Sequence, residues 1–267
     1  MTLPRRLAPA LVVALLGAGA PASGSPAAPE DVVEDGRHLR LDAGERGGIH
    51  VWLPAGYQRR TAGVLVYLHG YYTDVDQAWE QHRLAAQFRE SRRNALFIVP
   101  EAPVNNPDTV KWEDLGELLA FVRAHSGLPL PGGPVVVMGH SGAFRTIVPW
   151  MKSKRMSEII LLDGLYKMED EFKAWLTTHP RRRAHRLILV GYETSDRTER
   201  FLKQFPRAQS RPSIPESFEK FSPNERRARL FFLKSQFDHM EMVTSGKVIP
   251  LLLRLAPFGE VKPPRAR

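Results

Sequence analysis

Short apolar runs alternate with amphipathic segments along this chain from about residue 38 onward. Apolar, mainly β-branched runs predict strands over residues 49–53, 62–68, 95–99, 134–138, 158–162, 187–190 and 230–233. Apolar residues recurring every three or four positions predict helices over 77–89, 115–124, 144–151, 172–177, 197–205 and 245–255. This alternation is typical of a mainly parallel sheet with helices on both faces. We therefore predict an α/β fold.

No internal repeat and no clear linker divides the chain, so we predict a single domain over residues 28–267. Pro250 lies inside the last predicted helix and should kink it. A polar, proline-containing segment spans residues 195–228, where we predict a helix followed by a long loop. Residues 197–221 of this segment are long enough to form a small lid over a site.

The first residues differ in character from the rest of the chain. Arg5 and Arg6 precede an apolar stretch over 7–20, and residues 21–29 are small or proline. This order predicts a signal peptide over residues 1–27 and export to the periplasm or the extracellular medium. The chain has no cysteine, so it can form no disulfide, thiol nucleophile or lipoprotein anchor. No later run is apolar enough to predict a membrane span.

The basic residues are spread along the chain and give a formal net charge of +9. Spread charge favours solubility and attraction to anionic surfaces. We find no zinc-finger spacing, recognition-helix pattern or aromatic array, so we expect no nucleic acid partner. A His-Glu-x-x-His motif is also absent from the sequence, and we expect neither a metal nor an organic cofactor.

The strongest chemical signal is the segment 139–143, Gly-His-Ser-Gly-Ala. It follows a buried strand and precedes a helix, the context of a strained turn that exposes a serine nucleophile. Gly139 and Ala143 are small enough for the backbone to turn tightly around Ser141. Ala143 stands where the strict pattern has glycine, and its single methyl relaxes the match without cancelling it.

A serine hydroxyl needs a histidine base, and the histidine needs an acid that orients it. His239 lies just after the last predicted strand, and none of the other eight histidines lies beyond that strand. Asp163 ends the strand after the 144–151 helix, which makes it the preferred acid. Glu193 and Asp196 follow the next strand and remain alternatives.

Two backbone N–H groups should stabilise the oxyanion of the reaction. Gly142, the residue after the nucleophile, is expected to supply one of them. The loop that begins His69-Gly70 follows an earlier strand, and the N–H of Tyr71 in it is the expected second donor.

Together these motifs resemble the α/β-hydrolase superfamily over roughly residues 45–257. Asp163 directly follows the next strand after the serine turn, and this placement of the acid is similar to that in the platelet-activating-factor acetylhydrolase branch. The segment 162–166, Leu-Asp-Gly-Leu-Tyr, also resembles exported bacterial hydrolases of undefined substrate. The irregular turn over 191–196 departs from the family pattern and leaves the acid open.

The resemblance implies a serine hydrolase that cleaves a small-molecule or acyl ester through Ser141, Asp163 and His239. A peptidase or amidase with the same residues is one alternative. A non-catalytic binding protein with this fold is another. The sequence leaves the substrate and the oligomeric state undetermined.

Overall fold

A computed structural model describes residues 30–178 and 185–261 of the chain. Residues 1–29, which include the predicted signal peptide, lie outside this part. One ten-stranded sheet has the strand order β1-β2-β3-β5-β4-β6-β7-β8-β10-β9. The strands are β1 (Glu30–Val33), β2 (Gly36–Asp42), β3 (Gly48–Leu53), β4 (Gly63–Leu68), β5 (Ala95–Pro100), β6 (Val135–His140), β7 (Met156–Leu162), β8 (Arg186–Gly191), β9 (Gln209–Arg211) and β10 (Leu230–Lys234).

The sheet is antiparallel from β1 to β3 and where β3 meets β5, and parallel from β5 to β9. The α-helices are α1 (Val75–Gln81), α2 (Leu84–Ser91), α3 (Leu115–Ser126), α4 (Phe144–Trp150), α5 (Glu169–Thr177), α6 (Ser195–Leu202), α7 (Pro223–Arg227), α8 (Glu241–Thr244) and α9 (Val248–Leu253). Among the helices of the described residues, none combines the length and apolarity needed to cross a bilayer.

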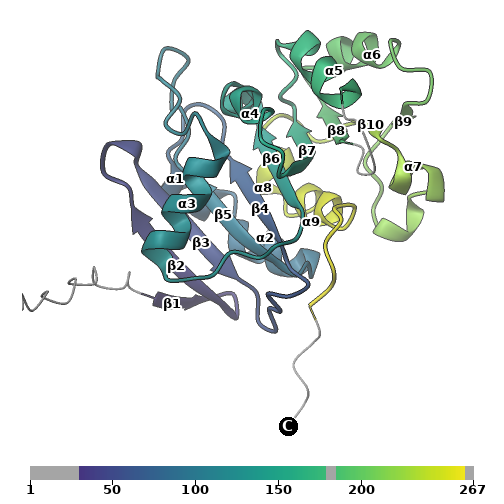
Figure 1. Ribbon diagram of the computed structural model, residues 1–267. Coiled ribbons are helices and arrows are strands. Elements are labelled where there is room, and N and C mark those ends of the chain that lie inside the picture. The colour runs from purple at the N-terminus through teal and green to yellow at the C-terminus, as the bar shows by residue number, and fades with distance from the viewer. Residues whose placement is uncertain (1–29, 179–184, 262–267) are drawn as a thin grey trace, which may run out of the picture.

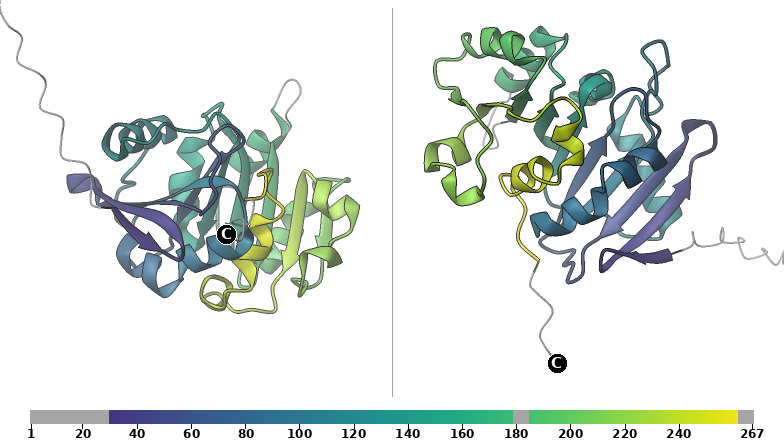
Figure 2. Two further views of the ribbon diagram at one scale, coloured as in Figure 1. Left: turned by 90° about the horizontal axis from the view of Figure 1, so that it is seen from below. Right: turned by 180° about the vertical axis from the view of Figure 1, so that it is seen from behind.

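Helices cover both faces of the sheet, as the apolar strand pattern predicts (Figure 1). Along β4, Val64 and Val66 pack on one face with residues of α3, α4 and α5. Leu65 and Tyr67 pack on the other face with residues of α1, α2, α8 and α9. The right-hand view of Figure 2 shows the yellow C-terminal helices on this second face. Both faces are buried, which explains why the strands are continuously apolar.

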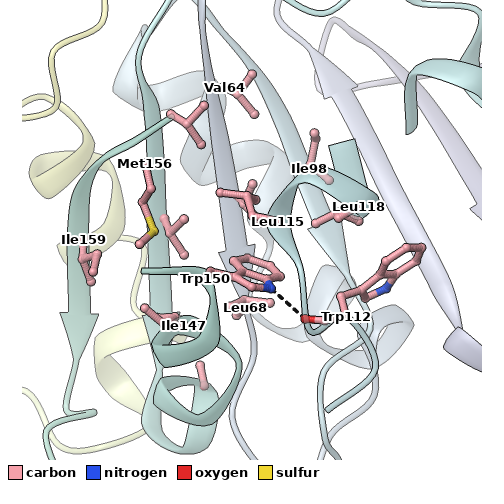
Figure 3. Packing of buried hydrophobic residues seen from close by; sticks show 14 of the residues in the cluster. Val64, Leu68, Ile98, Trp112, Leu115, Leu118, Ile147, Trp150, Met156 and Ile159 are labelled. Atoms are coloured by element: carbon pink, nitrogen blue, oxygen red, sulfur yellow. Dashed lines mark hydrogen bonds between the residues drawn. The ribbon is translucent and has the colours of Figure 1, made fainter. Parts of the chain in front are cut away.

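Side chains of α4 hold the helix that follows Ser141 firmly against the sheet. Trp150 is fully buried, and its indole N–H donates to the carbonyl oxygen of Trp112 at 2.7 Å (Figure 3). Ile147 packs beside it in the same core, which also contains Leu68 of β4. This packing fixes the position of the turn at the start of the helix.

The predicted strands are confirmed, but the N-terminal hairpin and two helix boundaries differ from prediction. β1 and β2 pair through a turn at Glu34 and Asp35, both with positive φ, and β2 extends the sheet beyond β3. The segment 77–89 forms two helices because the chain turns at Arg83, where φ is +50°. Trp79 and Leu84 are five positions apart, so a continuous helix would rotate one of them away from the sheet.

The predicted helix over 245–255 begins only at Val248, because Gly246 adopts a left-handed φ of +76°. Pro250 therefore lies in the first turn, where its missing N–H leaves no helical hydrogen bond unmade, so the reason for the predicted kink is removed. In the predicted lid segment, α6 is followed by β9, which pairs with β10 at the outer edge of the sheet. A lid function for this segment stays a prediction.

Candidate active site

The carboxyl ends of parallel strands meet at one edge of the sheet, and the predicted site residues follow these ends. Ser141 follows β6, Asp163 follows β7 and His239 lies beyond the end of β10. The loop that contains Tyr71 follows β4, which is the neighbour of β6. The topology thus brings residues far apart in sequence to a single edge.

Ser141 has a φ of +52°, the left-handed conformation that a non-glycine residue rarely adopts. Such backbone geometry costs of order 1–3 kcal/mol and persists only where the surroundings enforce it. Here the fixed strand β6 precedes the turn and the anchored helix α4 follows it. The methyl of Ala143 is accommodated in the turn, since this residue is buried.

His239 and Asp163 are directly hydrogen-bonded. The distance from His239 Nδ1 to Asp163 Oδ2 is 2.7 Å, and the Asp163 side chain is fully buried. Asp163 itself has a positive φ of +47°. Of the three candidate acids, Asp163 is therefore the one that contacts the imidazole, while Asp196 lies exposed on α6.

Donor groups surround the carboxylate of Asp163. Its Oδ1 accepts from the N–H groups of Tyr192 and Thr194, both at 2.9 Å, and from the Thr194 hydroxyl at 2.7 Å. Its Oδ2 also accepts from the N–H of Glu193 at 3.2 Å. Burial raises the pKa of Asp163, but the hydrogen bonds from His239, Thr194 and Tyr192 outweigh it, so the pKa lies well below its usual range.

An ionised carboxylate can only accept, so the proton between the two residues belongs to His239 Nδ1. The second nitrogen, Nε2, is then an acceptor in the neutral ring. Burial lowers the pKa of His239, but the hydrogen bond and charge of Asp163, with the charges of Glu193 and Asp238, raise it overall. This arrangement suits a base that must hold a proton briefly during reaction.

Sequence reasoning missed the role of His140, the residue before the serine. Its Nε2 lies 2.9 Å from the carbonyl oxygen of His239, and the two rings lie 4.5 Å apart. Burial, with the neighbouring His239 and His82, lowers the pKa of His140 to about 3. The neutral ring therefore donates to the His239 backbone and links that loop to the serine turn.

The loop that carries Tyr71 approaches the serine turn closely. A Cβ atom at Gly70 would lie 2.8 Å from the Cβ of Ser141, so only glycine fits there. The Tyr71 ring covers Gly142, where a Cβ would lie 2.5 Å from the ring. Both predicted oxyanion donors, the N–H groups of Tyr71 and Gly142, thus belong to adjoining segments beside Ser141.

Further contacts fix this loop. Tyr72, with a φ of +65°, donates its N–H to the carbonyl oxygen of Val104 at 2.7 Å. Arg145 of α4 donates to the Tyr71 hydroxyl at 3.2 Å and to the carbonyl oxygen of Asp108 at 2.7 Å. The sequence offered no signal for the Arg145 contacts, because they join segments that are far apart along the chain.

Asp163, Glu193 and His239 also form a group whose ligand-type atoms lie within 4.8 Å of one another. The 2.7 Å hydrogen bond between Asp163 and His239 engages the two atoms that would face an ion between them. Backbone and hydroxyl donors engage the other Asp163 oxygen. The donor set therefore fits an acid–base pair better than a metal centre.

The sequence matches no family model, and no curated protein matches it. Similar solved structures include an S-formylglutathione hydrolase from Agrobacterium tumefaciens, with 10% identity and a TM-score of 0.55, over 86% of this chain and 99% of that one. The fluorophosphonate-binding serine hydrolase F of Staphylococcus aureus has 12% identity and a TM-score of 0.53, over 85% and 99%. A ferulic acid esterase from the anaerobic fungus Anaeromyces mucronatus has 15% identity and a TM-score of 0.51, over 82% and 89%.

These likenesses cover most of the chain, and they agree with the predicted mainly parallel sheet with helices on both faces. The protein has the α/β-hydrolase fold.

Proposed function

We propose that the protein is a serine hydrolase that cleaves a carboxylic ester through Ser141, Asp163 and His239. The observation that carries this proposal is the 2.7 Å hydrogen bond between buried Asp163 and His239, at the sheet edge where Ser141 adopts its strained turn. A buried Asp–His pair beside a partly exposed serine at a strained turn is the arrangement that activates a hydroxyl nucleophile.

In the first half of the reaction, Ser141 Oγ attacks the ester carbonyl carbon while its proton passes to His239 Nε2. The carbonyl oxygen becomes negatively charged and accepts from the N–H groups of Tyr71 and Gly142. Asp163 holds the ring in the required tautomer and stabilises the imidazolium. The carbon–oxygen bond of the leaving alcohol then breaks, and His239 returns the proton to the alcohol.

In the second half, water attacks the acyl group on Ser141 and gives its proton to His239. The bond between the acyl carbon and Ser141 Oγ then breaks, and the serine recovers its proton. Each proton passes through the same ring nitrogen, so no cofactor is required by this sequence of steps.

Similarity to an S-formylglutathione hydrolase and a ferulic acid esterase favours an ester as the substrate class. An amide or peptide substrate is the nearest alternative, because it would use the same groups. A binding protein that retains the fold without catalysis is the other alternative.

The test compares the mature protein with Ser141→Ala on a panel of p-nitrophenyl esters of increasing acyl length. We expect hydrolysis by the wild type and loss to the background rate in the variant. Equal rates in the two proteins would exclude Ser141 as the nucleophile. If neither protein turns over the panel, labelling by a fluorophosphonate that requires Ser141 still supports a reactive serine, and the absence of labelling favours the binding protein.

We also propose that the protein is exported and that residues 1–27 are removed. The basic, apolar and small segments at the N-terminus support this proposal. Expression of the full chain and of a chain lacking residues 2–27, followed by fractionation and N-terminal sequencing, tests it. Retention of the full chain inside the cell with an intact N-terminus would contradict it.

A further inference from the structure

A second carboxylate lies beside the Asp163–His239 pair. Glu193 follows β8, and one of its oxygens lies within 4.8 Å of both an Asp163 oxygen and a His239 ring nitrogen. Unlike Asp163, Glu193 is exposed. It therefore faces the imidazole from the solvent side, where a substrate must approach.

Tyr166 holds this second carboxylate in place. Its hydroxyl donates to Glu193 Oε2 at 2.8 Å, and its ring lies edge-on to His239 with centroids 6.5 Å apart. Burial, the hydrogen bond to Glu193 and the charge of Asp163 raise the pKa of Tyr166, so its hydroxyl keeps its proton and donates. Glu193 is thus held by a phenol whose ring contacts the catalytic imidazole.

Within the described residues, no cationic side chain neutralises the charge of Glu193. Across residues 30–178 and 185–261, no lysine or arginine forms an ion pair with it. Arg197, on the helix that follows, donates instead to Glu169 at 3.0 Å and to the Tyr166 carbonyl oxygen. The negative charge is therefore available to a ligand.

Exposed tyrosines occur on both sides of the serine turn. Tyr192, beside Glu193, is 49% exposed, and Tyr72, in the loop after β4, is 87% exposed. The strand order places β6, which Ser141 directly follows, between β4 and β8. Aromatic faces attract cations and are commonly used to recognise quaternary ammonium groups, and Tyr192 is the neighbour of Glu193 in the sequence.

We propose that Glu193 is a specificity-determining residue that selects esters carrying a positively charged group, such as a quaternary ammonium, close to the scissile bond. This inference rests on the proposed serine hydrolase function. The Glu193 carboxylate and a substrate cation about 5 Å away attract each other in this partly solvated site. This attraction should raise kcat/KM on the order of tenfold over that of a neutral substrate.

The experiment measures kcat/KM for three thioesters that share a butyryl group. One carries the trimethylammonium of thiocholine, one has a tert-butyl group in its place, and one carries a carboxylate. The proteins are the wild type, Glu193→Gln, Glu193→Asp and a control, Glu199→Gln, which removes an equal charge on α6. Glu199 pairs with Lys234 at 3.6 Å, outside the site.

We expect the wild type and Glu199→Gln to prefer the cationic ester over its neutral isostere by about tenfold. The preference should fall to near unity in Glu193→Gln and return in part in Glu193→Asp. An equal ratio in the wild type and Glu193→Gln would overturn the inference. Ser141-dependent cleavage of all three esters without charge preference would do the same and leave the proposed function intact.

A second measurement does not require turnover. The rate at which Ser141 is phosphonylated by a cationic phosphonothioate and by its neutral isostere should show the same ratio in each protein. Equal rates for the two reagents in the wild type would overturn the inference. If the protein shows neither turnover nor phosphonylation, the serine hydrolase proposal fails and the inference fails with it.

Discussion

Replacing Asp163 with asparagine tests the assignment of the acid most directly. All the groups around the carboxylate are donors: the N–H groups of Tyr192, Glu193 and Thr194, the Thr194 hydroxyl and His239 Nδ1. An asparagine oxygen would face the three donors at Oδ1, because the opposite orientation places an amide NH₂ against them. The NH₂ group then points at His239, and the ring must accept from it at Nδ1.

This reversal moves the His239 proton to Nε2, where it can no longer accept from Ser141. Restoring the productive tautomer would place two donors face to face, at a cost of about 1–3 kcal/mol. The imidazolium also loses a charge-assisted hydrogen bond worth about 1.5–3 kcal/mol. At about 1.4 kcal/mol per factor of ten, kcat/KM should fall roughly 10²- to 10⁴-fold.

The assay compares kcat/KM and the fluorophosphonate labelling rate of Asp163→Asn, Asp196→Asn and the wild type. Asp196→Asn removes the same charge from an exposed helix position and should change the rate little. Thermal unfolding of each variant shows whether the protein remains folded. A fall of less than fivefold in Asp163→Asn, with a large loss in Asp196→Asn, would refute the assignment.

Two further predictions concern buried groups. His140→Phe removes the donor to the His239 carbonyl, so kcat should fall about tenfold with KM little changed, and steady-state kinetics should show partial recovery in His140→Gln. Unchanged kcat would contradict a positioning role. Burial raises the pKa of Glu158 to about 7, so the folded state binds an extra proton and loses stability as pH rises from about 4.5 through 7. In Glu158→Gln, up to about 3 kcal/mol of this pH-dependent loss of unfolding free energy should disappear. Thermal unfolding of both proteins at pH 5 and 8 measures it, and an identical pH dependence in the two would contradict the prediction.

The hydrophobic pattern determined the fold class, since two-sided burial requires continuous apolar strands. It missed β1, which is largely exposed, and β2, in which buried and exposed residues are interspersed, because neither contains such a run. It also joined α1 and α2, because the left-handed turn at Arg83 has no glycine or proline to mark it. Pairing in the sheet and packing against it, rather than local propensity, decided these elements.

At the candidate site, the sequence by itself determined which residues could carry the chemistry. Ser141 stands between a strand and a helix, and His239 follows the last parallel strand. Both positions can be located from the sequence, because the periodicity of apolar residues shows where a strand ends and where a helix begins.

Only the tertiary structure decided how these residues meet. Asp163 rather than Asp196 contacts His239 because the loop after β8 turns its N–H groups toward the end of β7. The contacts of Tyr166 with Glu193 and of His140 with the His239 backbone likewise join separate strand ends. Such contacts depend on strand order and loop geometry, and the local pattern of neighbouring residues in a single sequence reveals neither of them.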